Sequence, residues 1–270
     1  TVQLKAASGS GATVTWATDD KGWKFVYFDG VATNTGVFAI GQDLSDLVVN
    51  DLTINGELQA LGTIKLDGNY PTGTDNVALG NEALDSGSLS GGNNTAIGDN
   101  ALSANTSGAN NTAIGQAALC TNLTGGSNVA VGRCALKLNT ASNNVAVGYH
   151  SMCTTSSGTE NTAIGMSSLK SNTTADHNTA LGNQTLCKNT TGASNTAVGS
   201  CSLEANTTAE GNTAVGFESL KANTTGARNT AVGVEALCTN TTGARNIAIG
   251  YESMCKNTEG SDNTAFGTNS

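Results

Sequence analysis

The chain has 270 residues, of which only 4% are aromatic and 12% are charged, and its net charge is −9. This acidic chain has no cluster of Lys and Arg, which excludes a typical nucleic-acid-binding protein because phosphates are bound by basic surfaces. No apolar stretch is long enough to span a membrane, and the first residues lack the basic and apolar regions of a signal peptide.

Residues 1–41 hold most of the aromatic side chains, and we predict that they form a small β module used for attachment or for contact between subunits. Two apolar segments flank the polar sequence TDDKG, a pattern that predicts a hairpin. The aromatic group from Trp16 to Phe28 is interpreted as the core of this module. Binding to the face of a sugar ring is the alternative.

Residues 42–74 contain short apolar segments separated by Asn-Gly and Asp-Gly pairs. Such pairs favour tight turns between strands, so this part is predicted to be a shaft or linker of short strands. Pro71 marks the boundary with the sequence that follows.

Residues 75–270 repeat a five-residue motif, Asn-Thr-Ala-Val-Gly or a close variant, with a period of 17 residues apart from one step of 18 and one of 16. A short fixed period predicts a solenoid, in which each repeat buries apolar groups only by stacking on its neighbours. The glycines that close the motif are Gly80, Gly98, Gly115, Gly132, Gly148, Gly165, Gly182, Gly199, Gly216, Gly233, Gly250 and Gly267.

One repeat, numbered from its first Asn, has the pattern N-T-A-V-G-x-x-[A/S]-L-x-x-N-T-T-G-x-x. It is too short for a helical hairpin, and it predicts one coil of an all-β parallel β-solenoid with two short strands and two turns. The glycine at position 5 is expected to adopt a positive φ at a corner. Position 9 is always Leu or Met, which indicates a buried site of fixed volume. The predicted core residues at position 9 include Leu102, Leu119, Leu136, Leu169, Leu186, Leu203, Leu220 and Leu237.

The Asn residues at positions 1 and 12 are expected to stack in columns, with their amides bonded along the column and to turn backbone groups. The Asn-Thr-Thr sequence at position 12 also matches the N-glycosylation pattern. A third interpretation is a threonine array that orders water as an ice-binding surface does. Turn formation is the interpretation that we favour. The Asn-Thr-Thr sequences begin at Asn172, Asn189, Asn206, Asn223 and Asn240.

Positions 3 and 4 are both apolar in every repeat, although neighbours on a strand point to opposite faces. One arrangement puts the Ala inside the coil and the Val or Ile outside, as a long apolar stripe. The reverse leaves an Ala stripe outside. Either stripe indicates an interface, so we predict an oligomer around a long axis.

The seven cysteines occupy only two repeat positions. We interpret them as small buried residues that replace Ala, Ser or Thr. Two pairs, Cys120 with Cys134 and Cys187 with Cys201, have equal separations and could be bridged between coils. A metal site is the least favoured option, because no His accompanies the cysteines.

Few other residues suggest chemistry. His150 and His177 occupy different repeat positions without a partner, and Gly9–Gly11 lacks the third glycine and the helix of a phosphate-binding loop. The acidic residues two after the glycine are predicted to form a solvated face, offset by Arg228 and Arg245. Sugar cleavage by a carboxylate pair and cation binding are the alternatives. This acidic column contains Glu82, Glu218, Glu235 and Glu252.

The motif Asn-Thr-Ala-[Ile/Val]-Gly followed by a small residue and Leu resembles the head repeat of YadA-like trimeric autotransporter adhesins. Repeats of this type are similar to those in bacteriophage tail fibres. The resemblance covers residues 76–267 and implies a left-handed parallel β-roll assembled as a trimer. The period of 17 is longer than in the adhesin head, which suggests an extra turn in each coil, and the chain shows neither a secretion signal nor a C-terminal membrane barrel.

We therefore expect a non-enzymatic, homotrimeric phage fibre protein of the virion that needs no cofactor or metal and binds no nucleic acid. Its expected partners are other tail proteins, bound through residues 1–41, and a host cell-surface glycan or protein, bound toward the C-terminal side. The alternative is a bacterial cell-surface adhesin, and a capsular depolymerase is less favoured. The chain is expected to continue past Ser270.

Overall fold

The computed structural model of the chain describes residues 3–4, 14–15 and 74–270. The chain divides into two units, Thr1–Ile64 and Lys65–Ser270, and each is considered separately. In the first unit, β1 (Gln3–Leu4) pairs antiparallel with β2 (Val14–Thr15).

The other predictions for the N-terminal part lie outside the described residues. These are the second arm of the hairpin at residues 23–28, the aromatic core, the turn at Gly9–Gly11, and nearly all of the short-strand shaft.

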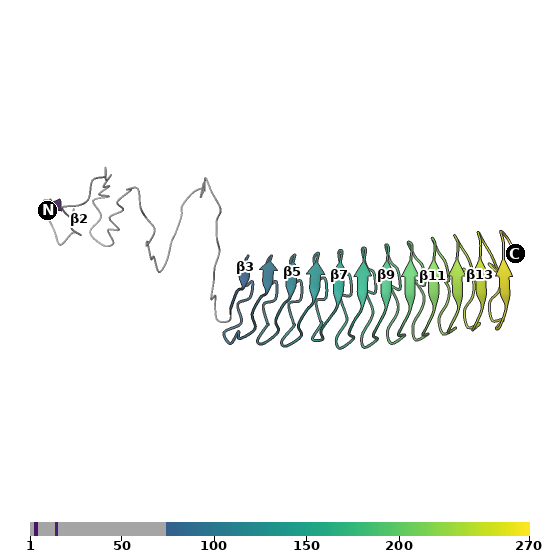
Figure 1. Cartoon of the computed structure of the whole chain (residues 1–270), viewed down its shortest axis with the longest axis horizontal. Coiled ribbons are helices and arrows are strands. Elements are labelled where there is room, and N and C mark those ends of the chain that lie inside the picture. Colours follow the sequence, from purple (N-terminus) through teal and green to yellow (C-terminus); the bar gives the residue numbers. More distant parts are fainter. Residues whose placement is uncertain (1–2, 5–13, 16–73) are drawn as a thin grey trace. The chain divides into compact units, whose positions relative to one another are not determined.

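The second unit is a parallel β-solenoid, which confirms the predicted all-β fold class (Figure 1). Its twelve strands form one sheet in which each strand pairs only with the strands of the preceding and following coils. The register is strict, because the Ala of each strand lies beside the Ala of the next, as Ala197 does beside Ala214. The strands are β3 (Val77–Leu79), β4 (Thr95–Ile97), β5 (Thr112–Ile114), β6 (Val129–Val131), β7 (Val145–Val147), β8 (Thr162–Ile164), β9 (Thr179–Leu181), β10 (Thr196–Val198), β11 (Thr213–Val215), β12 (Thr230–Val232), β13 (Ile247–Ile249) and β14 (Thr264–Phe266).

Each described coil contains one strand, where the repeat predicted two. The arm opposite the strand is held by hydrogen bonds between coils, such as Leu119 N–H to the carbonyl of Ala135 at 3.1 Å. It is not extended, because positions 7 and 9 have positive φ, with values of 55° at Ala117 and 51° at Leu119. The left-handed residues turn the backbone so that position 7 donates to the preceding coil, as the N–H of Ala117 does to the carbonyl of Asp99 at 2.9 Å, while position 9 donates to the next coil.

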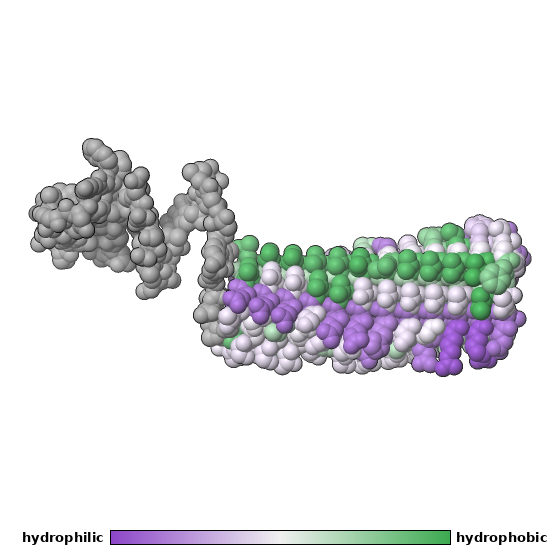
Figure 2. Space-filling model, in the orientation of Figure 1, coloured by the Kyte–Doolittle hydropathy of each residue, from purple (hydrophilic) through white to green (hydrophobic). Residues whose placement is uncertain are grey.

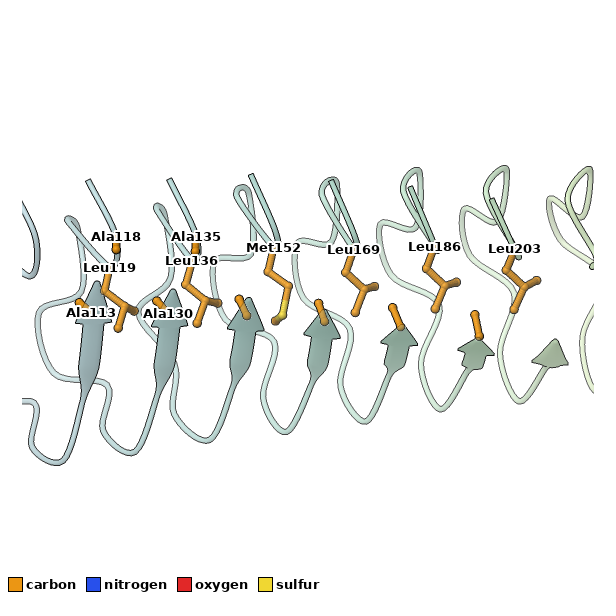
Figure 3. Packing of buried hydrophobic residues seen from close by; sticks show 14 of the residues in the cluster. Ala113, Ala118, Leu119, Ala130, Ala135, Leu136, Met152, Leu169, Leu186 and Leu203 are labelled. Carbon is orange, nitrogen blue, oxygen red and sulfur yellow. The ribbon is translucent and has the colours of Figure 1, made fainter. Parts of the chain in front are cut away.

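The left-handed conformation gives a second reason for the restriction of position 9 to Leu and Met. A β-branched residue is disfavoured at positive φ, so Ile and Val are excluded even though their volumes would fit. The side chains of this column, such as Leu136 and Leu203, are fully buried except for Met254 in the last coil, as are the Ala side chains of position 3 except in the first and last strands. Figure 3 shows the two columns facing each other across the thin interior of the coil.

The closing glycines form the corner after each strand. All twelve have φ between 122° and 141°, a region that residues with a Cβ rarely adopt. A Cβ on Gly199 would also lie 2.4 Å from the carbonyl oxygen of Gly216 in the next coil. Close stacking of the coils and the corner geometry therefore both require glycine here.

Both expected asparagine columns are present. At position 1, the backbone N–H of Asn94 donates to Oδ1 of Asn76 at 2.9 Å, and this link recurs in every coil to Asn263. At position 12, Nδ2 of Asn206 donates to Oδ1 of Asn189 at 2.8 Å and to the carbonyl of Ala209 at 3.1 Å. These bonds satisfy buried polar groups that would otherwise destabilise the fold, although Oδ1 of Asn122 in the position-12 column has no hydrogen-bond partner.

The position-12 column has an interruption in the β7 coil. Thr155 occupies the place of the Asn, and its buried hydroxyl makes no hydrogen bond. The preceding coil has 16 residues, and its Ala141 carbonyl accepts the amide of Asn139 at 2.8 Å, as a glycine carbonyl does elsewhere. The column continues without a gap from Asn172 to Asn257.

Candidate functional site

The outer face of the sheet carries the side chains of repeat positions 2 and 4, because the Ala at position 3 points into the core. We call the side chains at one position in successive coils a column and name it by that position. Of the two arrangements considered from the sequence, the structure therefore has the Ala inside and the β-branched residue outside.

Column 4 is an uninterrupted aliphatic and aromatic stripe along the solenoid. Figure 2 shows it as a continuous green band from the first coil to the last. Its exposure ranges from half-buried side chains such as Val215 to 66% at Phe266. The members of column 4 are Leu79, Ile97, Ile114, Val131, Val147, Ile164, Leu181, Val198, Val215, Val232, Ile249 and Phe266.

Column 2, beside it, is mostly threonine. Within the described part of the chain, the hydroxyls of these threonines make no hydrogen bond, so this side of the sheet has free donors next to aliphatic groups. The threonines of column 2 are Thr95, Thr112, Thr162, Thr179, Thr196, Thr213, Thr230 and Thr264.

Column 13 differs, although it also contains threonines. The hydroxyl of Thr173 donates to the carbonyl of Thr190 in the next coil at 3.0 Å, and Thr190 repeats this bond to Thr207. These hydroxyls donate hydrogen bonds that link successive coils, and the adjoining Asn side chains are fully buried. The Asn-Thr-Thr sequences therefore serve as turn and ladder elements, as the favoured interpretation held, and their asparagines are inaccessible to a glycan-transferring enzyme.

Column 6 follows the corner glycine, and in the first five coils it is a polar ladder. Nδ2 of Asn81 donates to Asp99 at 3.2 Å, and Gln116 donates to the other oxygen of Asp99 at 3.4 Å. Arg133 bonds to Gln116 at 2.9 Å and to the hydroxyl of Tyr149 at 3.3 Å, and its guanidinium lies over the Tyr149 ring. The hydrogen bond from Asn81, followed by those from Gln116 and Asn100, lowers the pKa of the Asp99 carboxyl below its ordinary value.

The same column becomes apolar in the β11 to β13 coils. Phe217, Val234 and Tyr251 succeed one another and are 47%, 40% and 49% exposed. Figure 2 shows apolar colour beside the main stripe toward the C-terminal end. Sequence reasoning missed this change, because it treated the x positions of the repeat as uninformative. Comparing position 6 from coil to coil is the signal that would have found it.

Column 7 contains the predicted acidic column, in which Glu218, Glu235 and Glu252 lie in successive coils, half-buried. Only Glu218 has an ion pair among them, with Lys221 at 2.7 Å.

The predicted offset by arginine is not seen. Arg228 pairs with Glu210 at 3.4 Å, and Arg245 pairs with Asp262 at 2.6 Å, both away from column 7. The acidic column therefore keeps most of its negative charge.

The cysteines are all free thiols, so neither proposed pair is bridged. Cys134 is buried, and the other six are half-buried, so the interpretation as small core residues holds fully only for Cys134. Burial raises the pKa of Cys120, Cys153, Cys187 and Cys238, which keeps these groups as poorly nucleophilic thiols.

The two histidines are held by separate neighbours. His150 stacks on Tyr149 with ring centroids 4.0 Å apart, and burial lowers the pKa of its imidazole. Nδ1 of His177 lies 3.1 Å from Glu160. No group of three or more His, Cys, Asp or Glu side chains in the described segments is placed to hold a metal ion.

The chain matches no protein-family model, no curated protein and no solved structure. Among the residues that the structure describes, there is also no helix with the length and hydrophobicity needed to span a bilayer.

Proposed function

We propose that this chain is a non-enzymatic structural and adhesive protein: a homotrimeric rod, part of a bacteriophage tail fibre, that presents a host-receptor-binding surface. The observation that carries the proposal is the uninterrupted apolar column 4, partly exposed in every coil. Soluble monomers rarely expose so long an apolar surface, and such surfaces mark protein interfaces.

The geometry of the stripe suits association about a long axis. Strict register places each column 4 side chain beside that of the next coil, and each coil supplies one aliphatic or aromatic side chain to the stripe. Three copies that turn these stripes toward one axis would bury them continuously. The free hydroxyls of column 2, next to the stripe, could then bond across the interface or to trapped water.

The assignment to a phage fibre depends on the resemblance of the repeat and on the short-strand sequence before it. The alternative is a bacterial surface adhesin of the trimeric autotransporter type, which the same repeats would suit. Neighbouring genes for tail or baseplate proteins would favour the fibre, whereas a membrane barrel encoded in the same gene would favour the adhesin. Release of sugars from a host capsule would favour an enzyme.

The oligomeric state tests the proposal directly. We expect the purified chain to sediment as a trimer at micromolar concentration. Val215→Asp combined with Val232→Asp should abolish the trimer, because two carboxylates would be buried in an apolar interface. The matched control is Thr208→Asp with Thr225→Asp, which places the same charges on exposed threonines of a different column. A well-folded wild-type monomer, or equal dissociation of the control, would contradict the proposed interface.

We also propose that residues 1–41 attach the rod to the virion, with host binding toward the C-terminal side. Deleting residues 1–41 should abolish incorporation into particles while the free trimer still binds host cells. Loss of cell binding by a still-trimeric fragment would reverse this polarity.

A further inference from the structure

In the β11 to β13 coils, column 6 places exposed apolar side chains, two of them rings, beside carboxylates in a regular array. Phe217, Val234 and Tyr251 are each followed by a glutamate of column 7, so every coil of this segment presents one apolar and one acidic side chain. Tyr251 is hydrogen-bonded to Glu252, which is also why its pKa is raised. Rings that stack on the C–H faces of sugars, next to carboxylates that accept hydrogen bonds from sugar hydroxyls, form a surface suited to sugars.

From this arrangement we infer that the β11 to β13 coils bind a neutral polysaccharide chain, which lies along the solenoid over Phe217, Val234 and Tyr251. The inference rests on the proposed function, in that it specifies the receptor class and the surface that contacts it.

The spacing supports an extended polymer. Strands of successive coils lie about 4.8 Å apart, so the rings of Phe217 and Tyr251 are separated by about 10 Å, with Val234 between them. Two rings at that separation can take alternate sugar units of one extended chain. The backbone beneath them is fixed by hydrogen bonds in each coil, which reduces the ordering that binding requires.

The charge of the segment favours a neutral ligand over an anionic one. The whole chain has a net charge of −9, and column 7 adds three successive glutamates beside the rings. The ammonium of Lys221, in the same segment, is already paired with Glu218 at 2.7 Å. An acidic polysaccharide or a nucleic acid would therefore be repelled along the entire contact.

Column 6 also differs from the surface proposed for self-association. Column 4 is apolar in every coil, as an interface running the whole length of a trimer requires. Column 6 is a polar ladder in the first five coils, and apart from the single Met166 in the β8 coil its exposed apolar side chains are the consecutive ones of the β11 to β13 coils. A side-chain pattern confined to one segment fits a ligand of limited length better than a second copy of the chain.

Binding of the full-length protein to a printed array of neutral and anionic oligosaccharides tests the inference. We expect signal on extended neutral oligosaccharides, with Phe217→Ala combined with Tyr251→Ala reducing the apparent affinity at least tenfold. Asn183→Ala with Ser200→Ala is the matched control, because it changes two polar positions of the same column. The control should bind as the wild type does.

Three outcomes would overturn the inference: no signal on neutral oligosaccharides, preferential binding to anionic ones, or equal binding by the Phe217→Ala, Tyr251→Ala variant. Sedimentation of the same samples separates this result from the proposed function. If the wild type is a trimer but fails on the array, only the inference fails. If the aromatic variant loses the trimer, column 6 belongs to the self-association surface, which also overturns the inference.

Discussion

Column 6 has opposite chemistry in two segments that share the same backbone geometry, the β3 to β7 coils and the β11 to β13 coils. From Asn81 to Tyr149 the side chains bond to one another from coil to coil, whereas Phe217, Val234 and Tyr251 point to solvent without such links. In the polar segment the side chains hydrogen-bond to one another, so few donors and acceptors remain for a partner molecule. In the apolar segment the exposed side chains of Phe217, Val234 and Tyr251 remain available for contact with a partner. In a repeat protein, therefore, a binding site is expected in the coils where the side chains of one column change from polar to apolar.

The columns that build the fold do not change in this way. The Asn of column 1, the Ala of column 3, the glycine of column 5 and the Leu or Met of column 9 recur in both halves. Each is fixed by burial, by hydrogen bonding or by a positive φ that only certain residues adopt. Column 6 has no such restriction, because its side chains leave the corner toward solvent.

The largest expected effect tests whether the N-terminal and C-terminal coils both require glycine at the corner after the strand. Gly98→Val and Gly199→Val should each lower the free energy of unfolding by about 3 kcal/mol, the upper range for a residue held in a disfavoured backbone region. The new Cβ would also overlap the backbone of the next coil, at 2.7 Å and 2.4 Å respectively. Denaturant unfolding measures both, with the exposed substitution Thr208→Val as control. A normal midpoint in either variant would show that the halves differ at the corner.

The second prediction concerns the left-handed Leu of column 9. Leu203→Ile keeps the volume but places a β-branched residue at φ 49°, and we expect a loss of about 2 kcal/mol. Leu203→Met should lose less than about 1 kcal/mol, because Met is unbranched and occurs naturally in this column. Leu119→Ile should match Leu203→Ile if both halves are built alike. Equal stability of the Ile and Met variants would mean that volume alone selects the residue.

The third prediction, with a smaller expected effect, concerns column 12. Its chain of Asn–Asn hydrogen bonds is interrupted in the N-terminal half of the solenoid and continuous in the C-terminal half. Thr155→Asn should extend the ladder from Asn172 toward Asn139 and stabilise the protein by about 1 kcal/mol, the net value of a buried hydrogen bond. The reverse change, Asn206→Thr, should destabilise it by at least as much, because it leaves amide partners unsatisfied. Thermal unfolding of both variants checks the pair. Destabilisation by Thr155→Asn would indicate that the shortened neighbouring coil leaves no room for an amide.

The smallest expected effect is the pH dependence that arises from the polar segment of column 6. Hydrogen bonds lower the pKa of folded Asp99 below its ordinary value of 3.8, so the folded state binds this proton less tightly than the unfolded chain. The resulting stabilisation is present above the unfolded pKa and is lost as pH falls through the folded pKa. Asp99→Asn should therefore reduce the fall in unfolding temperature between about pH 5 and about pH 3. Asp262→Asn, outside column 6, provides a comparison, since the pKa of Asp262 is lowered as well, by Arg245. An unchanged acid response in Asp99→Asn would show that the polar ladder adds nothing in solution.

The sequence by itself determined the repeat, the parallel solenoid, the corner glycines and the stacked asparagines. Each of these follows from a local property, such as a fixed period, a residue without a Cβ, or an amide that can bond along a column. The same reasoning attributed the restriction of column 9 to Leu and Met to the fixed volume of a buried site, which is only one of the two causes. The positive φ of Leu119 and its equivalents could not be predicted from the repeat, because this backbone angle depends on how the second arm contacts the next coil.

Tertiary structure alone decided three further matters. It placed the Ala of column 3 inside and the β-branched residues of column 4 outside, a choice that alternation left open because both residues are apolar. It paired Arg228 and Arg245 with Glu210 and Asp262 rather than with the acidic column, since coil-to-coil distance, not charge alone, selects partners. It also brought residues 16 to 18 apart into the contacts that make column 6 a polar ladder in the β3 to β7 coils, and it left Phe217, Val234 and Tyr251 exposed in the β11 to β13 coils.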